Sequence, residues 1–259
     1  MRDLVIVITG ASSGIGAALA ELVGKQGAKP VLLARREPEL LAVAARSGSH
    51  ALPIVTDVTK RAEVERAAMQ TIARFGQLDV WVNNAGRGIT RMVSELTDAD
   101  LDEMFTVNVK SALYGMQAVL PHFKQRGRGH IINISSMLGR VPFAPFRSAY
   151  SASKHALNSL TANLRMELRG TGIHVSTVSP GVVATDFGSK ALHGGIDSRA
   201  LPGSQTAEEV AEVIADVIER PRADVYTRPE GRQVITDYYA AEDMAVAEAQ
   251  FGGPPRPPT

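Results

Sequence analysis

The chain has 259 residues, 44% of them apolar, and its 28 Lys and Arg residues against 27 Asp and Glu residues give a formal net charge of +1. This balance is typical of a soluble globular protein and disfavours a nucleic-acid partner, which a basic excess would attract. The absence of cysteine excludes disulfides, thiolate nucleophiles and cysteine-ligated metals. The apolar run at residues 4–8 is far shorter than the ~20 residues of a membrane-spanning helix, so we expect no membrane partner and a cytoplasmic protein.

Short runs rich in valine and isoleucine alternate with longer stretches that carry apolar residues at helical spacing. The runs predict strands at residues 4–9, 30–34, 51–55, 79–82, 130–134, 173–178 and 224–227. The longer stretches predict helices at residues 14–26, 38–46, 61–75, 101–125, 149–168 and 207–219. The early strands lack polar alternation, which is typical of parallel strands covered on both faces. We therefore predict an α/β fold with one doubly wound parallel sheet, a Rossmann fold, in a single domain over residues 1–250.

Two segments rich in glycine and proline stand outside this alternation. Residues 251–259 predict a flexible tail. Residues 188–203 show neither strand nor helix periodicity, and a loop of this length inside a compact domain is usually functional. We expect a loop at about residues 186–205 to contact the substrate.

The segment TGASSGIG, at residues 9–16, follows the first predicted strand and opens the first predicted helix. Glycines at positions 10 and 14 permit a positive φ and close backbone approach, and the N–H groups of a helix start attract a pyrophosphate. Its spacing, Gly-x-x-x-Gly-x-Gly, differs from the commonest dinucleotide fingerprint, and a simple tight turn is the alternative interpretation. Its place after the first strand of a doubly wound chain favours phosphate binding.

The second predicted strand ends in Arg35 and Arg36, where an NAD-specific site would usually carry an acidic residue for the ribose 2′-hydroxyl. The planar guanidinium of Arg35 can pair with a 2′-phosphate, aided by Ser12 or Arg36. The sequence therefore favours NADP(H), with NAD(H) still possible.

Tyr150 and Lys154 are four positions apart on a predicted helix and share one of its faces. A free tyrosine has a pKa of about 10, and a neighbouring ammonium favours its ionised form. Ser136 ends the fifth strand at the ligand-binding edge of the sheet, and its hydroxyl can bond a substrate oxygen. Asn108 lies in an apolar helical stretch, where a buried amide needs hydrogen-bonding partners. Together these residues predict general acid and base chemistry at that edge.

In order and approximate spacing, these motifs resemble the short-chain dehydrogenase/reductase family, in its compact single-domain subgroup. The resemblance covers nearly the whole chain. The matching positions are Thr9, Gly10, Gly14, Gly16, Asp57, Asn83-Asn84-Ala85-Gly86, Asn108, Ser136, Tyr150, Lys154 and Pro180-Gly181.

The resemblance implies roles for the residues at these positions. Tyr150 would protonate the carbonyl oxygen in reduction, or take the alcohol proton in oxidation, while Lys154 would lower its pKa and bind the nicotinamide ribose. Ser136 would hold the reacting oxygen, and Asn108, by disturbing its helix, would support a water that relays protons. Fourteen positions separate Ser136 from Tyr150, one more than the commonest family spacing, so Ser135 remains an alternative. The implied cofactor-binding residues are Gly10, Ser12, Ser13, Gly14, Ile15, Gly16, Arg35, Arg36, Asp57, Val58, Asn84, Ala85, Gly86, Tyr150, Lys154, Pro180, Gly181, Val183 and Thr185.

We therefore expect an NADP-preferring oxidoreductase that moves a hydride between a nicotinamide and a small-molecule carbonyl or alcohol. Apolar side chains at residues 137–146 and 187–192 suit a moderately large apolar ketone, aldehyde or secondary alcohol, while Arg140 and Arg147 leave room for an anionic group. The resemblance also implies a homotetramer or homodimer that pairs the helices at residues 101–125 and 149–168.

Other functions fit the sequence less well. A catalytically silent sensor of NADP on the same fold would not require all four residues of the Asn108, Ser136, Tyr150 and Lys154 set. The six histidines form no recognisable ligand motif, so we predict no metal. A serine hydrolase would need a Gly-x-Ser-x-Gly elbow, and an epimerase or dehydratase of the extended relatives would need a larger C-terminal substrate domain.

Overall fold

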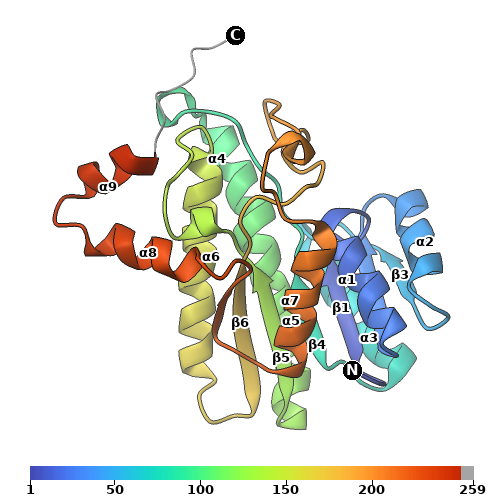
Figure 1. The fold of residues 1–259 in the computed structure, drawn as a ribbon. Helices are drawn as coiled ribbons and strands as arrows, with labels where there is room; N and C mark the ends of the chain where they lie inside the picture. Colours follow the sequence, from blue (N-terminus) through green and yellow to red (C-terminus); the bar gives the residue numbers. More distant parts are fainter. Residues whose placement is uncertain (252–259) are drawn as a thin grey trace.

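Seven parallel strands form one sheet in the computed structural model, which describes residues 1–251, with the order β3-β2-β1-β4-β5-β6-β7 (Figure 1). The strands are β1 (Val5–Thr9), β2 (Lys29–Ala34), β3 (Leu52–Val55), β4 (Val80–Asn83), β5 (Gly129–Ile134), β6 (Ile173–Ser179) and β7 (Asp224–Tyr226). Each end lies within one residue of its predicted position, and the prediction of a doubly wound parallel sheet is confirmed. The predicted tail at residues 252–259 lies outside the described residues.

Nine α-helices are described within residues 1–251. They are α1 (Gly14–Lys25), α2 (Glu37–Arg46), α3 (Arg61–Phe75), α4 (Asp98–Phe105), α5 (Ser111–Arg126), α6 (Ser148–Glu167), α7 (Ala207–Glu219), α8 (Gly231–Ala240) and α9 (Met244–Phe251). The prediction of one continuous helix at residues 101–125 is wrong, because a π-helical turn at Thr106–Lys110 separates α4 from α5. Two further helices, α8 and α9, had not been predicted from the sequence. None of the helices in the described part of the chain is long and apolar enough to cross a membrane.

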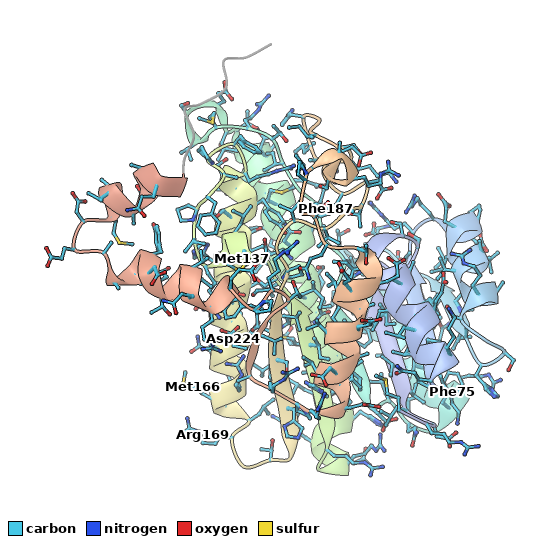
Figure 2. The ribbon with its side chains drawn as sticks, viewed as in Figure 1. Phe75, Met137, Met166, Arg169, Phe187 and Asp224 are labelled. Carbon is cyan, nitrogen blue, oxygen red and sulfur yellow. The ribbon has the colours of Figure 1, made fainter. Side chains whose placement is uncertain are left out.

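The two faces of the sheet bury separate apolar layers, because neighbouring residues of a strand point to opposite faces. In β1, Ile6 and Ile8 pack with α1, α2 and α7, whereas Val5 and Val7 pack with α3, α5 and α6. All four side chains are fully buried. Figure 2 shows Phe187 in the loops above the carboxyl ends of the strands, and Phe75 and Arg169 at the opposite end of the molecule. The helices therefore cover both faces and leave the carboxyl edge open to ligands.

A chain of buried polar side chains ties the middle of the sheet to α6. Trp81 Nε1 donates to Asn83 Oδ1 at 2.7 Å, and Asn83 Nδ2 donates to Asn133 Oδ1 at 2.8 Å. Asn133 Nδ2 in turn donates to Thr161 Oγ1 on α6, also at 2.8 Å. All four side chains are buried, so each depends on the others to satisfy its polar atoms.

Replacing Asn133 with Ala should lower the free energy of unfolding by about 1–3 kcal/mol, because it leaves buried partners unsatisfied. Asn163→Ala is the matched control, since Asn163 is exposed and, among residues 1–251, its side chain bonds only Ser159 O, one turn earlier in its own helix. That variant should change the stability by less than about 0.5 kcal/mol. Urea unfolding measures both values, and equal losses would contradict a special role for the buried chain.

Candidate active site

The carboxyl ends of the central strands open into one cavity of about 1390 Å³. All the predicted catalytic and cofactor-binding residues line this cavity except Gly16 and Asn108, which lie directly behind its wall. The structure therefore brings together residues from positions 10 to 185 of the chain. The cavity is larger than the ~300–1,000 Å³ typical of small-molecule sites, as a dinucleotide together with a substrate would require.

Close backbone packing at the end of β1 shapes the glycine loop. Gly10 has φ +67°, and a Cβ there would lie 2.9 Å from Ala85 Cα. A Cβ at Gly16 would lie 2.5 Å from Gly10 O and 2.6 Å from Asn84 Nδ2. Asn84 Nδ2 donates to Thr9 O at 2.8 Å, and Thr9 Oγ1 accepts from the backbone N–H groups of Asn84 and Ala85. Asn84 thus has the structural role of tying the loop to β4 while it also lines the cavity.

The N-terminus of α1 faces this cavity with the features that a dinucleotide needs. Gly14 begins the helix at φ +55°, and Ser13, its N-cap residue, makes no side-chain cap. Arg36 instead donates to both Ser12 Oγ and Ser13 Oγ, at 3.0 Å each. The first N–H groups of α1 are therefore left for an anionic ligand, so the residues present fit a nicotinamide dinucleotide.

Arg35 is exposed at the end of β2 and lines the cavity. It forms no hydrogen bond or ion pair with any other residue in the range 1–251, whereas Arg36 pairs with Glu39 as well as with the two serines. Its charge does reach Asp57: burial raises the pKa of that carboxyl, but hydrogen bonds from Thr59 and the charge of Arg35 lower it overall. Arg35 is thus the cation at this end of the cavity that is free to bind a phosphate.

Tyr150 and Lys154 lie one turn apart near the start of α6, and both are buried. Lys154 Nζ donates to Ile134 O at 2.8 Å and lies 5.7 Å from the centre of the Tyr150 ring. Burial lowers the pKa of Lys154 to about 8. Burial also raises the pKa of Tyr150, against the opposing effects of the Ser136 hydroxyl and the Arg147 charge. In the protein alone, the loss of water around the phenol outweighs these two effects, and Lys154 is not among the groups that lower the pKa of Tyr150.

The two candidate serines at the end of β5 point to different surroundings. Both serines line the cavity, but Ser136 is the one whose hydroxyl lowers the pKa of the Tyr150 phenol, and it accepts from Leu138 N at 3.1 Å. Ser135 Oγ is turned toward Gly139, where an added Cβ would lie 2.8 Å from it and 2.8 Å from Asn158 Nδ2. Of the two hydroxyls, that of Ser136 is the one beside the Tyr150 phenol.

Asn108 lies in the π-helical turn, where the helix is disturbed as expected. Its Oδ1 accepts from Arg87 N at 2.9 Å, and its Nδ2 donates to Arg87 O and to Ser153 Oγ, both at 3.0 Å. A Cβ at Gly86 would lie 3.1 Å from Asn108 Oδ1, so glycine there admits the amide. The sequence analysis missed Ser153, although its position directly before Lys154 on the same helix was a signal that could have identified it.

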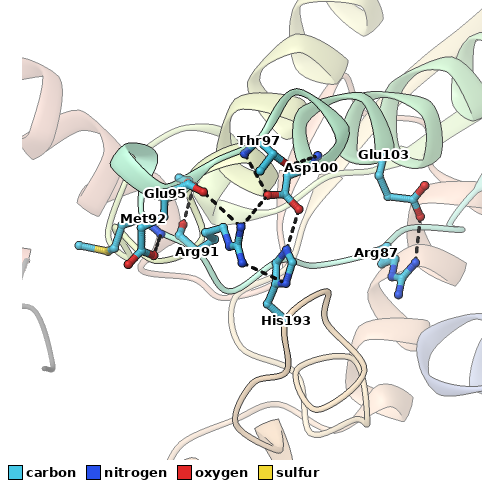
Figure 3. A network of polar contacts seen from close by, with 9 residues as sticks. Arg87, Arg91, Met92, Glu95, Thr97, Asp100, Glu103 and His193 are labelled. Carbon is cyan, nitrogen blue, oxygen red and sulfur yellow. Dashed lines mark hydrogen bonds and ion pairs between the residues drawn. The ribbon is translucent and has the colours of Figure 1, made fainter. Parts of the chain in front are cut away.

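The remaining wall of the cavity is formed by residues from segments 87–103, 138–147 and 186–201, which we call the substrate half. Its loops are joined by polar contacts (Figure 3). His193, with φ +62°, bonds Asp100 Oδ1 at 2.6 Å, and Arg91 pairs with the other oxygen of Asp100 at 3.3 Å. The hydrogen bond from His193 and those from Thr97 hold the pKa of Asp100 at about 2. His193 is exposed, and its side chain also fastens the 186–201 segment to α4.

Apolar side chains complete the substrate half. Phe187 packs edge-on against the ring of Tyr150, with 5.6 Å between ring centres. Leu138, Phe143 and Phe146 also line the cavity, as expected for an apolar substrate. Within residues 1–251, no group of three or more His, Asp or Glu side chains is arranged to hold a metal ion.

Comparisons with known proteins agree with this geometry. The family model described as short chain dehydrogenase matches residues 4–194. An uncharacterized oxidoreductase of Staphylococcus saprophyticus subsp. saprophyticus is 41% identical over 189 residues, which cover 71% of this chain and 80% of the relative. One from Staphylococcus epidermidis is 36% identical over 196 residues, covering 73% and 85%.

Solved structures give the same picture. A short chain dehydrogenase/reductase from Burkholderia phymatum in complex with NAD has a TM-score of 0.85 and 27% identity, covering 100% of this chain and 98% of its own. An alcohol dehydrogenase from Thermococcus sibiricus complexed with 5-hydroxy-NADP has a TM-score of 0.76 and 27% identity, covering 87% and 96%. A 3-ketoacyl-(acyl-carrier-protein) reductase from Brucella melitensis complexed with NADH has a TM-score of 0.80 and 28% identity, also covering 87% and 96%.

The lowered pKa of Lys154 predicts a stability effect that depends on pH. Between pH 8 and about 10.5 the unfolded chain holds a proton on this lysine that the folded chain has lost, so the folded state gains stability as the pH rises. Relative to Lys154→Met, the free energy of unfolding of the wild type should therefore rise by about 1.4 kcal/mol per pH unit in this window. Urea unfolding at several pH values measures how the difference in free energy of unfolding between wild type and variant changes with pH. Lys110→Met, at an exposed lysine, is the control, and this difference should stay constant for it. The same change with pH for both variants would contradict the prediction.

Proposed function

The chain belongs to the short-chain dehydrogenase/reductase family, and from this premise we propose that it is an NADP-preferring carbonyl reductase or secondary alcohol dehydrogenase. Members of this family are oxidoreductases that use a nicotinamide cofactor. The observation that carries the finer proposal is the buried Tyr150 phenol at the cavity wall, with the Ser136 hydroxyl beside it and Lys154 one turn further along α6.

In the proposed reaction, Ser136 Oγ and the Tyr150 hydroxyl hold the reacting oxygen of the substrate between them. Because burial raises its pKa, the phenol keeps the proton that it donates to the carbonyl oxygen during reduction. The Lys154 ammonium stabilises the phenolate left behind, and Ile134 O fixes that ammonium in place. Asn108 positions this group by joining Arg87 to Ser153 on α6. A nicotinamide held in this cavity would supply or accept the hydride.

The proposed substrate is a moderately large ketone, aldehyde or secondary alcohol. Phe187 and Leu138 give the substrate half apolar walls beside Tyr150, and His193 holds the loop at about residues 186–205 against α4. We also propose a homodimer or homotetramer through α5 and α6, since α6 exposes Leu160 and Met166, at 37% and 59% of their surface.

Replacing Tyr150 with Phe removes the proposed acid and leaves the ring in place. The rate of NADPH oxidation with a panel of ketones and aldehydes should fall about 10²- to 10⁴-fold, while NADPH binding measured by fluorescence is retained. Tyr239→Phe, at an exposed tyrosine of α8, is the matched control and should keep the wild-type rate. Undiminished turnover by Tyr150→Phe would exclude the proposed role. Wild-type protein that binds NADPH without any turnover would instead favour the silent sensor.

The free guanidinium of Arg35 carries the proposed preference for NADP. Arg35→Asp should lower the ratio of kcat/KM with NADPH to that with NADH by about tenfold or more, because a charge-assisted pair with the 2′-phosphate becomes a repulsion. Steady-state kinetics with both cofactors measures the ratio. Arg74→Asp makes the same charge change on α3, away from the cavity, and should leave the ratio unaltered. An unchanged ratio in Arg35→Asp would show that another group selects the cofactor.

A further inference from the structure

Arg147 places a cation in the substrate half that the proposed reaction does not use. It is the residue before α6, three positions ahead of Tyr150, and it is partly buried. Its Nη1 donates to Ile89 O at 3.2 Å, and its guanidinium lies 5.6 Å from the centre of the Phe146 ring. A Cβ at Gly88 would lie 3.0 Å from that Nη1 and 3.1 Å from Phe187 Cε1. Glycine at position 88 therefore lets the guanidinium reach the cavity wall beside the phenylalanine that covers Tyr150.

The other cations that line the substrate half are neutralised by carboxylates. Arg87 pairs with Glu103 at 2.9 Å, Arg91 pairs with Asp100, and Lys190 pairs with Asp186. Arg147, by contrast, has no ion pair with any Asp or Glu in the described residues. Loss of water around the guanidinium lowers its pKa, but arginine stays charged at neutral pH. A partly desolvated cation without a counter-ion is unfavourable, and it is the expected state of a group that binds an anion.

The backbone holds Arg147 in this position before any ligand binds. Arg91 N donates to Phe146 O at 2.7 Å, and Ser148 Oγ donates to Arg91 O at 2.6 Å. These bonds flank an isolated parallel bridge between Arg91 and Arg147. The two segments are therefore fixed to each other on both sides of the arginine, so little ordering remains to be done when a ligand arrives.

The position of Arg147 also limits how far its ligand lies from the reacting oxygen. Gly88 faces both the Arg147 Nη1 and Phe187, and the Phe187 ring centre lies 5.6 Å from that of Tyr150, so one aromatic ring links the guanidinium to the phenol. Phe187 and Gly88 close the space around both groups. A planar guanidinium binds a carboxylate through two parallel hydrogen bonds.

We propose that Arg147 binds a carboxylate of the substrate, so that the protein reduces oxo acids whose carboxylate lies a few carbons from the carbonyl group. This substrate class rests on the proposed carbonyl reductase function. The alternative role for Arg147 is an electrostatic effect on Tyr150 alone. That effect would change the reduction of charged and neutral substrates equally, whereas a carboxylate subsite would favour the charged ones.

The test compares substrates that differ only in charge. The 2-, 3-, 4- and 5-oxohexanoates and their methyl esters are offered with NADPH to the wild type and to Arg147→Gln. The wild type should prefer at least one acid to its ester. In Arg147→Gln, kcat/KM for that acid relative to its ester should fall about tenfold or more, chiefly through KM. The pH profile of ester reduction should keep its shape.

Two control variants locate the effect. Arg87→Gln removes the same charge from the same cavity at a paired arginine, so the acid-to-ester ratio should change much less. Arg147→Lys should recover part of the ratio, because it restores the charge but not the planar fork. Thermal unfolding confirms that each variant is folded.

The outcomes separate this inference from the function beneath it. If Arg147→Gln lowers kcat/KM equally for acids and esters, or shifts the pH profile for both, Arg147 acts through its charge on Tyr150. Either result would overturn the carboxylate subsite but not the reductase function. Wild-type preference for the esters would do the same. Wild-type protein that reduces neither acids nor esters, nor any ketone or aldehyde of the wider panel, would overturn the reductase function and the subsite with it.

Discussion

The hydrogen bond from Lys154 Nζ to Ile134 O is the constraint on which the site depends. A lysine that is 4% exposed is stable only with a fixed polar partner, and the last carbonyl of β5 provides one. This bond fixes the first turns of α6 against the edge of the sheet. Tyr150, one turn earlier, is thereby set beside Ser136, which follows β5 by two positions. The position of the Tyr150 phenol relative to the Ser136 hydroxyl thus follows from the hydrogen bond between the buried Lys154 ammonium and the end of β5.

A second requirement is room for backbones to approach one another. Gly10, Gly16 and Gly86 each lie where a Cβ would press on a neighbouring backbone or amide group. These close approaches let Asn84 and Asn108 satisfy backbone groups of the loops that end β1 and β4. Asn84 and Asn108 therefore hold in place the two loops that flank the cavity. The same residue can thus stabilise the fold and shape the site.

The strands could be predicted to within one residue because their valine and isoleucine runs are bounded by turns. Apolar spacing alone could not predict the break between α4 and α5, since that spacing continues through Thr106–Lys110. Only the family resemblance implied a disturbance at Asn108, where the structure shows long-range bonds to Arg87 and Ser153. The sequence favoured Ser136 but left Ser135 as an alternative, because the side that each serine faces depends on the residue at which β5 ends. The hydrogen bond between His193 and Asp100 joins residues 93 positions apart, so no local sequence pattern could predict it.

The charge distribution within the cavity distinguishes its two halves. At the cofactor end, Arg36 is occupied by Ser12, Ser13 and Glu39, and Arg35 is left free. In the substrate half, carboxylates neutralise the arginines of the loops, and Arg147 is left free. Paired cations contribute little field at a distance, so, apart from the buried Lys154, each half presents one strong positive centre instead of a diffuse positive surface. With the proposed cofactor and substrate, such an arrangement would select a ligand by where its negative groups lie, with one near the adenosine end and one near the reacting carbon.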